Sequence, residues 1–405
     1  MKQVKKNIIF ILKFIQYSIF FIPSFLFLIL IRIIKPIIHI RFGSVLSARI
    51  GHFVYDIEFY LCQKNKLKNK SLDFFYLDNQ GWPLATRNKF LLKMVKRKIY
   101  SSYIFKYIIF FNNYFPDSSR FKINMMQKEF GRTIDLKHSL TYSNPQLNFT
   151  ILENKKGIEF LSKYDIQKND KYICLVVRDS EYLNQEFKGR NWNYHNYRNA
   201  DIKTYFKACI YLANKGYKVF RMGKIVKEKI ENIHPNIIDY ANSEYRSDFL
   251  DIWLLSNCYY SLGTNTGLDS ICRINKIPFI SSNFLPARDI YVDCNVLIAP
   301  KKLYWKNSNI QLNLSEMIEF SYGRTEEYIQ NNIDILDLNE NEILDCVLQM
   351  EEKLNNIETR NKELQKKSDL FWKVFTKKVY GQYKDFKVYK DCEIANFYLK
   401  NLLIE

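Results

Sequence analysis

The first pattern along the chain is an apolar segment without charge. Residues 14–31 (FIQYSIFFIPSFLFLILI) follow four lysines and precede Arg32 and Lys35. About 18 apolar residues are the lower limit for a helix that spans a bilayer, and Pro23 in their middle can kink the helix. Three interpretations stay open: a single span, an interfacial or re-entrant helix, and a buried core helix. Basic residues on both flanks leave the orientation of a span open.

Residues 36–165 begin with the pattern of a parallel α/β domain. The apolar run 37–42 predicts a strand, and residues 53–63, after a glycine-bounded turn, predict a helix. Residues 72–77 predict a second short strand, and the basic, aromatic residues 87–115 predict mainly helix. A strand followed by a turn and a helix is the opening unit of a parallel sheet.

From residue 166 the alternation of strand and helix becomes regular. Continuous apolar runs predict strands over residues 172–177, 217–222, 236–240, 259–263 and 278–281. Amphipathic segments between them predict helices over residues 201–214, 247–256 and 268–273. Alternation at such short intervals favours a doubly wound parallel sheet. Further along the chain, the pattern predicts one long helix over residues 341–367.

These patterns divide the chain into four parts. Residues 1–35 are the apolar anchor or interfacial helix, 36–165 a first Rossmann-like domain, 166–350 a second one, and 351–405 helices that pack back on the body. We expect the two α/β domains to face each other across a cleft. Ligands of open α/β sheets bind beyond the carboxyl ends of the strands. Residues that directly follow the predicted strands are therefore the candidates for a site.

Composition and cysteine spacing narrow the class of protein. The 405 residues are 47% hydrophobic and 25% charged, which is typical of a globular chain. The 12 glycines and 9 prolines exclude collagen-like and low-complexity architectures. The eight cysteines lie far apart, without metal-ligand spacing, which excludes a zinc knuckle or a small disulfide scaffold and favours a reducing compartment.

The positive charge is concentrated in the first third of the chain. Residues 1–150 hold 24 Lys and Arg against 7 Asp and Glu, a net charge of +17, whereas residues 151–405 have a net charge of +2. Zinc-finger, helix-turn-helix and aromatic RNA-binding motifs are absent from the sequence, so we expect no nucleic-acid partner. Basic residues beside an apolar segment favour an anionic membrane surface as the partner.

The strongest candidate for a phosphate site follows the strand predicted over residues 259–263. Its turn consists of Gly263, Thr264, Asn265, Thr266 and Gly267. Small residues let the backbone approach a ligand closely, and the first amides of the next helix favour a diphosphate. The alternative is a plain turn in which Thr264 or Thr266 caps the helix.

Basic residues follow other predicted strands. Arg178 comes directly after residues 172–177, and Arg198 precedes the helix over 201–214. An Arg at a strand end can grip phosphate with two hydrogen bonds; the alternative for Arg178 is a surface pair with Asp179. The candidate phosphate ligands are Arg178, Arg198, Arg221, Gly223 and Lys224, although Arg221 and Lys224 also fit rim charges.

Three acidic or basic side chains complete the candidates. Asp248 and Asp251 are candidates for contacts to ribose or sugar hydroxyls, and the alternative is an acidic first turn of a helix that Ser247 caps. His52 is the candidate catalytic base for a hydroxyl group, and the alternative is a capping or buried His. Because no Asp-x-Asp metal motif stands out, we expect a mechanism without a metal and no cofactor.

Four stretches resemble a group of bacterial surface-polysaccharide glycosyltransferases of the GT-B type. They are RIGHF (49–53), residues 197–224, residues 237–255 and SLGTNTGLD (261–269). The second α/β domain is similar, more loosely, to fucosyltransferase-like and heptosyltransferase-like domains, in which a strand-end Arg and a Gly-bearing turn hold the diphosphate. The His-x-Arg of fucosyl transfer is missing, because Val176 stands where His would be.

The resemblance implies that a sugar moves from a nucleotide-sugar donor, held by residues 166–350, to a lipid-linked or membrane-associated glycan acceptor met by residues 36–165. It also implies a role in cell-envelope polysaccharide or lipopolysaccharide synthesis, at the cytoplasmic face of the inner membrane. Two other functions stay open at this point: a nucleotide-sugar epimerase of the same fold, and a non-catalytic membrane scaffold of a polysaccharide assembly complex.

Overall fold

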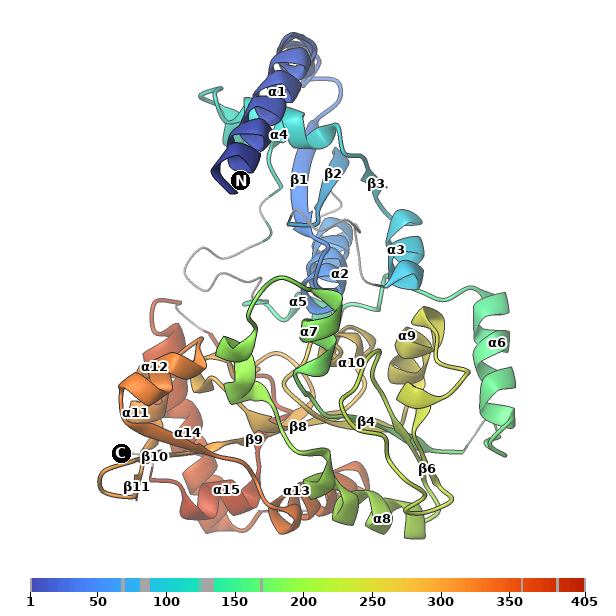
Figure 1. The fold of residues 1–405 in the computed structure, drawn as a ribbon, viewed down its shortest axis with the longest axis vertical. Coiled ribbons are helices and arrows are strands. Elements are labelled where there is room, and N and C mark those ends of the chain that lie inside the picture. The colour runs from blue at the N-terminus through green and yellow to red at the C-terminus, as the bar shows by residue number, and fades with distance from the viewer. Residues whose placement is uncertain are drawn as a thin grey trace. The chain divides into compact units, whose positions relative to one another are not determined.

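The chain forms two compact units. The computed structural model describes residues 2–66, 70–80, 88–123, 125, 135–167, 170–357, 360–383 and 386–403. Unit 1 consists of residues 1–134 and 143–148, and unit 2 consists of residues 135–142 and 149–405. Each unit has a parallel sheet of its own (Figure 1).

Unit 1 is built on a small parallel sheet. Its strands β1 (Ile40–Leu46), β2 (Leu72–Asp78) and β3 (Tyr100–Ser101) lie in the order β1-β2-β3. Helix α2 (Ile50–Lys66) connects β1 to β2, and α3 (Lys89–Lys96) precedes β3. Helices α1 (Lys2–Ile33) and α4 (Phe105–Asn112) pack against each other. The predicted strand-turn-helix opening is confirmed, with the strand beginning three residues later than the pattern indicates.

A buried carboxylate joins the elements of unit 1. Asp73 of β2 accepts hydrogen bonds from Arg41 at 2.9 and 2.8 Å and from Tyr60 at 2.6 Å. Burial opposes its ionisation, but these donors together hold the pKa of Asp73 below its usual value. The charge is therefore compensated within the fold, as a buried ion must be.

Unit 2 is a doubly wound sheet of seven parallel strands. The strands are β4 (Tyr172–Val176), β5 (Lys218–Arg221), β6 (Ile237–Ile238), β7 (Tyr260–Thr264), β8 (Phe279–Phe284), β9 (Val296–Pro300) and β13 (Cys392–Ile394). Their order is β13-β9-β8-β7-β4-β5-β6. Strands β4, β5 and β6 follow one another from the middle of the sheet toward one edge, and β7, β8 and β9 follow one another toward the other edge. This is the strand order of Rossmann sheets. The predicted doubly wound sheet is confirmed for this unit.

Three helices of unit 2 occur between the strands where the sequence predicted them, and other elements were not predicted. The predicted helices correspond to α8 (Phe206–Asn214), which follows the 3-10 turn η3 (Ile202–Tyr205), α9 (Asp248–Asn257) and α10 (Asp269–Asn275). A short antiparallel sheet of β10 (Lys302–Trp305), β11 (Ile310–Gln311) and β12 (Ile333–Leu336) was not predicted. Unit 2 also contains α6 (Ile151–Ser162) and the C-terminal elements α14 (Lys362–Tyr380), β13 and α15 (Asn396–Asn401).

The single long helix predicted over residues 341–367 is wrong. Helix α13 (Glu340–Leu354) ends two residues before Asn356, whose φ of +58° no α-helix continues. A new helix, α14, starts at Lys362, where the side chain of Asn361 accepts a hydrogen bond from the amide of Leu364. Asn favours both the left-handed and the capping conformation. Asn356 has the first of these conformations and Asn361 the second.

Candidate functional site

The carboxyl ends of β4 and β7 lie side by side where the strand order of unit 2 reverses. Val176 pairs with Gly263, and the amide of Arg178 donates to Oγ1 of Thr264 at 3.0 Å. A Cβ on Gly263 would lie 2.9 Å from the carbonyl oxygen of Val176. Gly263 is therefore required for the close approach of the two strands. A topological switch point of this kind is where open α/β sheets bind their ligands.

The side chains of the turn after β7 are held by the protein itself. Thr264 is buried, and the side chain of Asn265 bonds to the carbonyl of Leu285 at 3.2 Å and to the hydroxyl of Tyr291 at 3.1 Å. The amide and hydroxyl of Thr266 donate to the carboxyl group of Asp269 at 3.0 and 3.2 Å. These side chains fix the shape of the turn, so its contribution to a ligand would come from the backbone of residues 265–267.

The helix after the turn is too short to make a strong anion site by itself. Helix α10 has seven residues, and the carboxyl group of its first residue, Asp269, already accepts the amide hydrogen of Thr266. Burial raises the pKa of Asp269 to about 7, although its hydrogen bonds from Thr266 favour the ionised form. The helix-dipole contribution expected from the sequence is therefore small, and the positive charge for a diphosphate must come from side chains.

Three basic side chains are the candidates for that charge. We call Arg178, Arg198 and Lys301 the switch-point cations: each follows or faces the carboxyl edge of the sheet. Arg198 donates from its terminal nitrogen to the carbonyl of Asn265 at 2.5 Å, and its buried Nε has no acceptor among the described residues. Arg178 is half-buried and lies two residues after the end of β4. The edge of the sheet is thus basic at the point where the turn after β7 begins.

Lys301 was not predicted from the sequence. It directly follows β9, is only 2% exposed, and bonds through Nζ to the carbonyl of Asn199 and to Asp337, both at 2.6 Å. Burial and the nearby charge of Arg178 lower its pKa, and Asp337 opposes this shift. The signal that could have identified it is the apolar run VLIAP, which was not recognised as a strand. Lys301 follows this run as Arg178 follows the run over residues 172–177.

Other predicted ligands lie in ion pairs of unit 2. Arg221 is 2% exposed and bonds to Asp239 at 3.0 Å. Lys224 pairs with Glu186 at 2.7 Å, and Gly223 has a φ of +152°, which only glycine adopts easily. Among the described residues, the printed partners of Arg221 and Lys224 are thus carboxylates rather than the turn after β7.

The two predicted sugar-contacting carboxylates share a partner. Arg246 bonds to Asp248 at 3.0 Å and to Asp251, which also accepts a hydrogen bond from Tyr240. Burial raises the pKa of Asp251 to about 6, against the opposing effect of Arg246. Ser247 caps α9 by accepting a hydrogen bond from the amide of Leu250 at 3.2 Å. This cluster organises the start of α9.

His52 lies in unit 1. It is in the first turn of α2, just after the carboxyl end of β1, and its side chain is half-buried. This position at a strand's carboxyl end agrees with the one inferred from the sequence, and its role as a base stays a prediction. Among the described residues, no group of three or more His, Cys, Asp or Glu side chains is arranged to hold a metal ion.

The titration of Asp269 predicts a pH dependence of anion binding. Its pKa of about 7 means that the carboxyl is neutral below neutrality and ionised above it, where it adds a negative charge beside the turn. We expect nucleoside diphosphate affinity to fall by about 3- to 10-fold from about pH 6 to about pH 8. The Asp269→Asn variant should lose that part of the dependence. Titration calorimetry of both proteins checks this, and equal pH profiles would contradict it.

The strand order and the cationic switch point define unit 2 as a Rossmann-type α/β unit with a candidate anion site. No protein-family model matches the chain, and no curated protein matches it.

Several solved structures are similar to it, among them three glycosyltransferases. A glycosyl transferase family 9 protein from Veillonella parvula is 10% identical with a TM-score of 0.38, over 65% of this chain and 86% of its own. The ADP-heptose LPS heptosyltransferase II of E. coli is 9% identical with a TM-score of 0.32, over 60% of this chain and 84% of its own. The iron-containing dodecameric glycosyltransferase TibC of enterotoxigenic E. coli is 12% identical with a TM-score of 0.33, over 60% of this chain and 58% of its own.

All three are glycosyltransferases, as is the family that the sequence resembles. A likeness at TM-scores of 0.38 and below carries no argument about the activity of this chain. The residues at the switch point are therefore what indicates a function for this chain.

Proposed function

We propose that the chain is a glycosyltransferase that moves a sugar from a nucleotide-sugar donor to a membrane-associated glycan or lipid-linked acceptor in cell-surface polysaccharide synthesis. The observation that carries the proposal is the contact of Arg198 with the carbonyl of Asn265 in the turn after β7, next to Arg178, whose amide donates to Thr264 at the end of β7. The diphosphate of the donor would lie there, with the buried Nε of Arg198 gaining the acceptor that it lacks among the described residues.

The proposed reaction needs no metal. The acceptor hydroxyl oxygen attacks the anomeric carbon, the bond from that carbon to the diphosphate breaks, and the nucleoside diphosphate leaves with the electron pair. Guanidinium groups and backbone amides stabilise the charge that develops on the leaving group. We assign the acceptor's hydroxyl proton to His52, since a neutral imidazole accepts a proton near neutral pH. Unit 1 would provide the acceptor side and unit 2 the donor side.

A nucleotide screen tests the donor site. Titration calorimetry of the full chain with UDP, GDP, ADP and CMP should give binding of at least one nucleotide, and binding of none would contradict the proposal. Incubation of the matching nucleotide sugar with a lipid-linked saccharide, whose sugar hydroxyl is the nucleophile, should then give transfer. Free sugar or an epimerised product without acceptor would instead indicate the epimerase.

We further propose that the protein works at the cytoplasmic face of the inner membrane, held by residues 1–35. Among the described residues, one helix is long and apolar enough to cross a membrane by length and composition, over Ile15–Ile33. The proposed lipid-linked acceptor and the apolar helix over Ile15–Ile33 both support a location at the membrane.

A further inference from the structure

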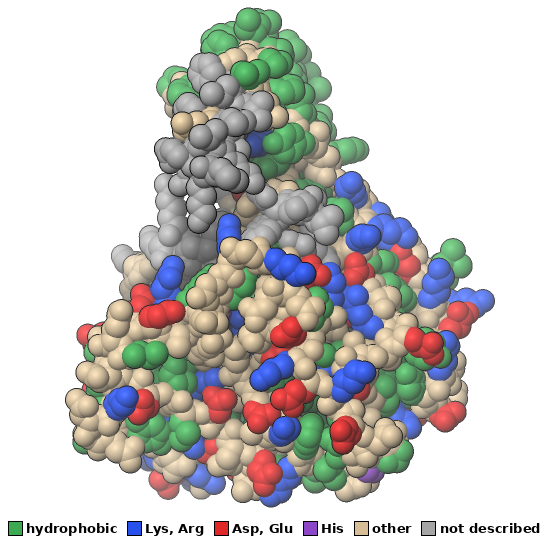
Figure 2. Space-filling view, in the orientation of Figure 1, with side chains coloured by type: hydrophobic (Ala, Val, Ile, Leu, Met, Phe, Trp, Pro, Cys, Tyr) green, Lys and Arg blue, Asp and Glu red, His purple; other side chains and the backbone are tan. Residues whose placement is uncertain are grey.

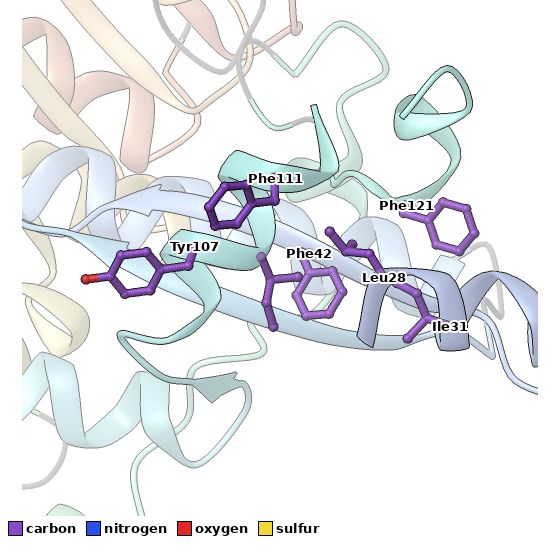
Figure 3. Close-up of a cluster of buried hydrophobic side chains, with 7 residues drawn as sticks. Leu28, Ile31, Phe42, Tyr107, Phe111 and Phe121 are labelled. Atoms are coloured by element: carbon purple, nitrogen blue, oxygen red, sulfur yellow. The ribbon is translucent and has the colours of Figure 1, made fainter. Parts of the chain in front are cut away.

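One face of helix α1 is part of the core of unit 1. Leu28 and Ile31 are fully buried, and they lie in one cluster with Phe42 of β1, Phe121, and Tyr107 and Phe111 of α4 (Figure 3). Further toward the N-terminus, the ring of Phe20 stacks on Tyr107 with centroids 4.3 Å apart. This face of the segment is therefore protein core.

The end of α1 is fixed by a charged side chain. Arg32 donates to Asp117 at 2.9 Å, to Asn112 at 2.8 Å and to the carbonyl of Leu28 at 2.9 Å. Its guanidinium carbon lies 4.0 Å from the centroid of the Phe115 ring. Because these partners come from α4 and the loop after it, the last turn of α1 is tied to the folded unit.

The opposite face of α1 is apolar and exposed. Its side chains recur every three or four residues, which is one face of a helix: Ile15, Ile19, Ile22, Leu26, Ile29 and Ile33. Ile22 is 65% exposed and Leu26 60%. Helix α4 and its flanks add exposed Ile104, Phe110 and Tyr114. We call these residues the α1–α4 apolar face; Figure 2 shows hydrophobic side chains gathered over these helices.

The buried face argues against a helix that crosses the bilayer. A span over Ile15–Ile33 would place Leu28, Ile31 and Arg32 at membrane depth, together with their partners on α4 and β1. The folded elements that pack on α1 would then have to enter the bilayer beside it, and the Arg32–Asp117 pair would be drawn to the hydrocarbon boundary, near which buried charges become costly. A helix with one face on a folded unit and one bare apolar face fits the plane of the interface, about 5–10 Å into one leaflet.

The charge around the apolar face indicates the chemistry of the surface it meets. Residues 1–150 have a net charge of +17. Lys106 of α4 lies beside Tyr17 of α1 and beside Tyr103, which precedes α4, and Lys35 lies 5.7 Å from the ring centroid of Phe121. Basic residues near a bilayer are attracted to anionic lipids, and aromatic residues favour the headgroup region.

We infer that unit 1 docks on an anionic lipid bilayer in a monotopic manner, with the α1–α4 apolar face in a single leaflet and residues 15–33 in the plane of the interface. This inference rests on the membrane location given in the proposed function. It adds which surface of the protein binds, which lipids it binds and how it is attached. Vesicle binding and nucleotide binding are separate measurements, so the failure of one is distinguishable from the failure of the other.

Vesicle binding tests the docking surface. The full chain is sedimented with vesicles of phosphatidylcholine alone and with added phosphatidylglycerol. The wild type should bind the anionic vesicles, and Ile22→Ser/Leu26→Ser should lower the partition coefficient by about 30-fold or more, since two large apolar side chains no longer enter the leaflet. The matched control Ile151→Ser/Leu152→Ser removes two exposed apolar residues of unit 2 and should bind as the wild type does.

Equal binding by Ile22→Ser/Leu26→Ser, with a wild-type circular dichroism spectrum, would overturn the apolar face as the docking surface. Equal binding to neutral and anionic vesicles would overturn the anionic partner.

Labelling from one side of the membrane separates docking from spanning. The eight native cysteines are all buried, so a new exposed cysteine gives the main signal with an impermeant maleimide. Asn7→Cys marks the start of α1 and Lys163→Cys marks unit 2, both at exposed positions. In sealed inverted and right-side-out vesicles, both should be labelled from the same side. Labelling from opposite sides would show a span and overturn the monotopic mode.

Discussion

Replacing Arg178 and Arg198 together by Ala should weaken the binding of a nucleoside diphosphate by about 100- to 10,000-fold. A hydrogen bond to a charged group contributes about 1.5–3 kcal/mol, and each 1.4 kcal/mol is about a factor of ten in affinity. The guanidinium of Arg198 bonds to the carbonyl of Asn265 in the turn after β7, and Arg178 is joined to the end of β7 through its amide, which donates to Thr264. Titration calorimetry with the nucleotide that binds best measures the loss.

Two further variants make the result specific. Lys373→Ala/Lys377→Ala removes the same charge from exposed positions on α14 and should leave the affinity within about twofold, because exposed distant charges are screened. Arg178→Lys/Arg198→Lys keeps the charge but not the planar fork and should give an intermediate loss. If the double Ala variant folds and binds as tightly as the Lys373→Ala/Lys377→Ala control, the donor site lies elsewhere.

The elements around the site could be predicted because their signals are local. The strands β4 and β7 are continuous apolar runs with a polar or glycine-bearing boundary, so both their existence and their ends are visible in the sequence. Parallel strands have their carboxyl ends at one edge, which is why Arg178 and the turn at Gly263–Gly267 were expected there. Their direct contact, from the amide of Arg178 to Thr264, agrees with that reasoning.

The partners of charged side chains could not be predicted. Arg221 has the same strand-end sequence pattern as Arg178, yet it bonds to Asp239, 18 residues further on, beside the neighbouring strand β6. Which cation faces a ligand and which faces a carboxylate depends on tertiary pairing, which one sequence does not reveal. Lys301 was missed for the related reason that β9 was not predicted, so no strand end marked it.

The two faces of α1 were hidden by its composition. Nearly every position from 14 to 31 is apolar, so the sequence does not distinguish the face of the helix that is buried in the core from the face that is exposed. Packing distinguishes them: Leu28 and Ile31 have partners on β1 and α4, whereas Leu26 and Ile29 are exposed. A membrane span, an interfacial helix and a core helix differ in which faces of α1 are buried by protein, and the sequence therefore left all three open.

The second large effect is expected at Gly157 of α6, where Gly157→Ala should lower the free energy of unfolding of unit 2 by about 3 kcal/mol. A Cβ there would lie 2.0 Å from Cε2 of the Trp253 indole. The indole is buried and its Nε1 donates to Asn154 of the same helix at 3.1 Å, so it has little room to move. Alanine gains about 1 kcal/mol in helix propensity over glycine, but the overlap with a fixed ring outweighs that gain. Urea unfolding followed by tryptophan fluorescence measures the change.

Gly323→Ala is the matched control, because a Cβ at Gly323 meets no atom within 4 Å. Its free energy of unfolding should stay within about 0.5 kcal/mol of the wild type. A large loss at Gly157 and none at Gly323 would place α6 against α9 through the face that carries Gly157, and so assign residues 149–165 to the unit that holds the switch point. Equal, small changes in the two variants would show that α6 does not pack on Trp253, and the start of unit 2 would then lie further along the chain.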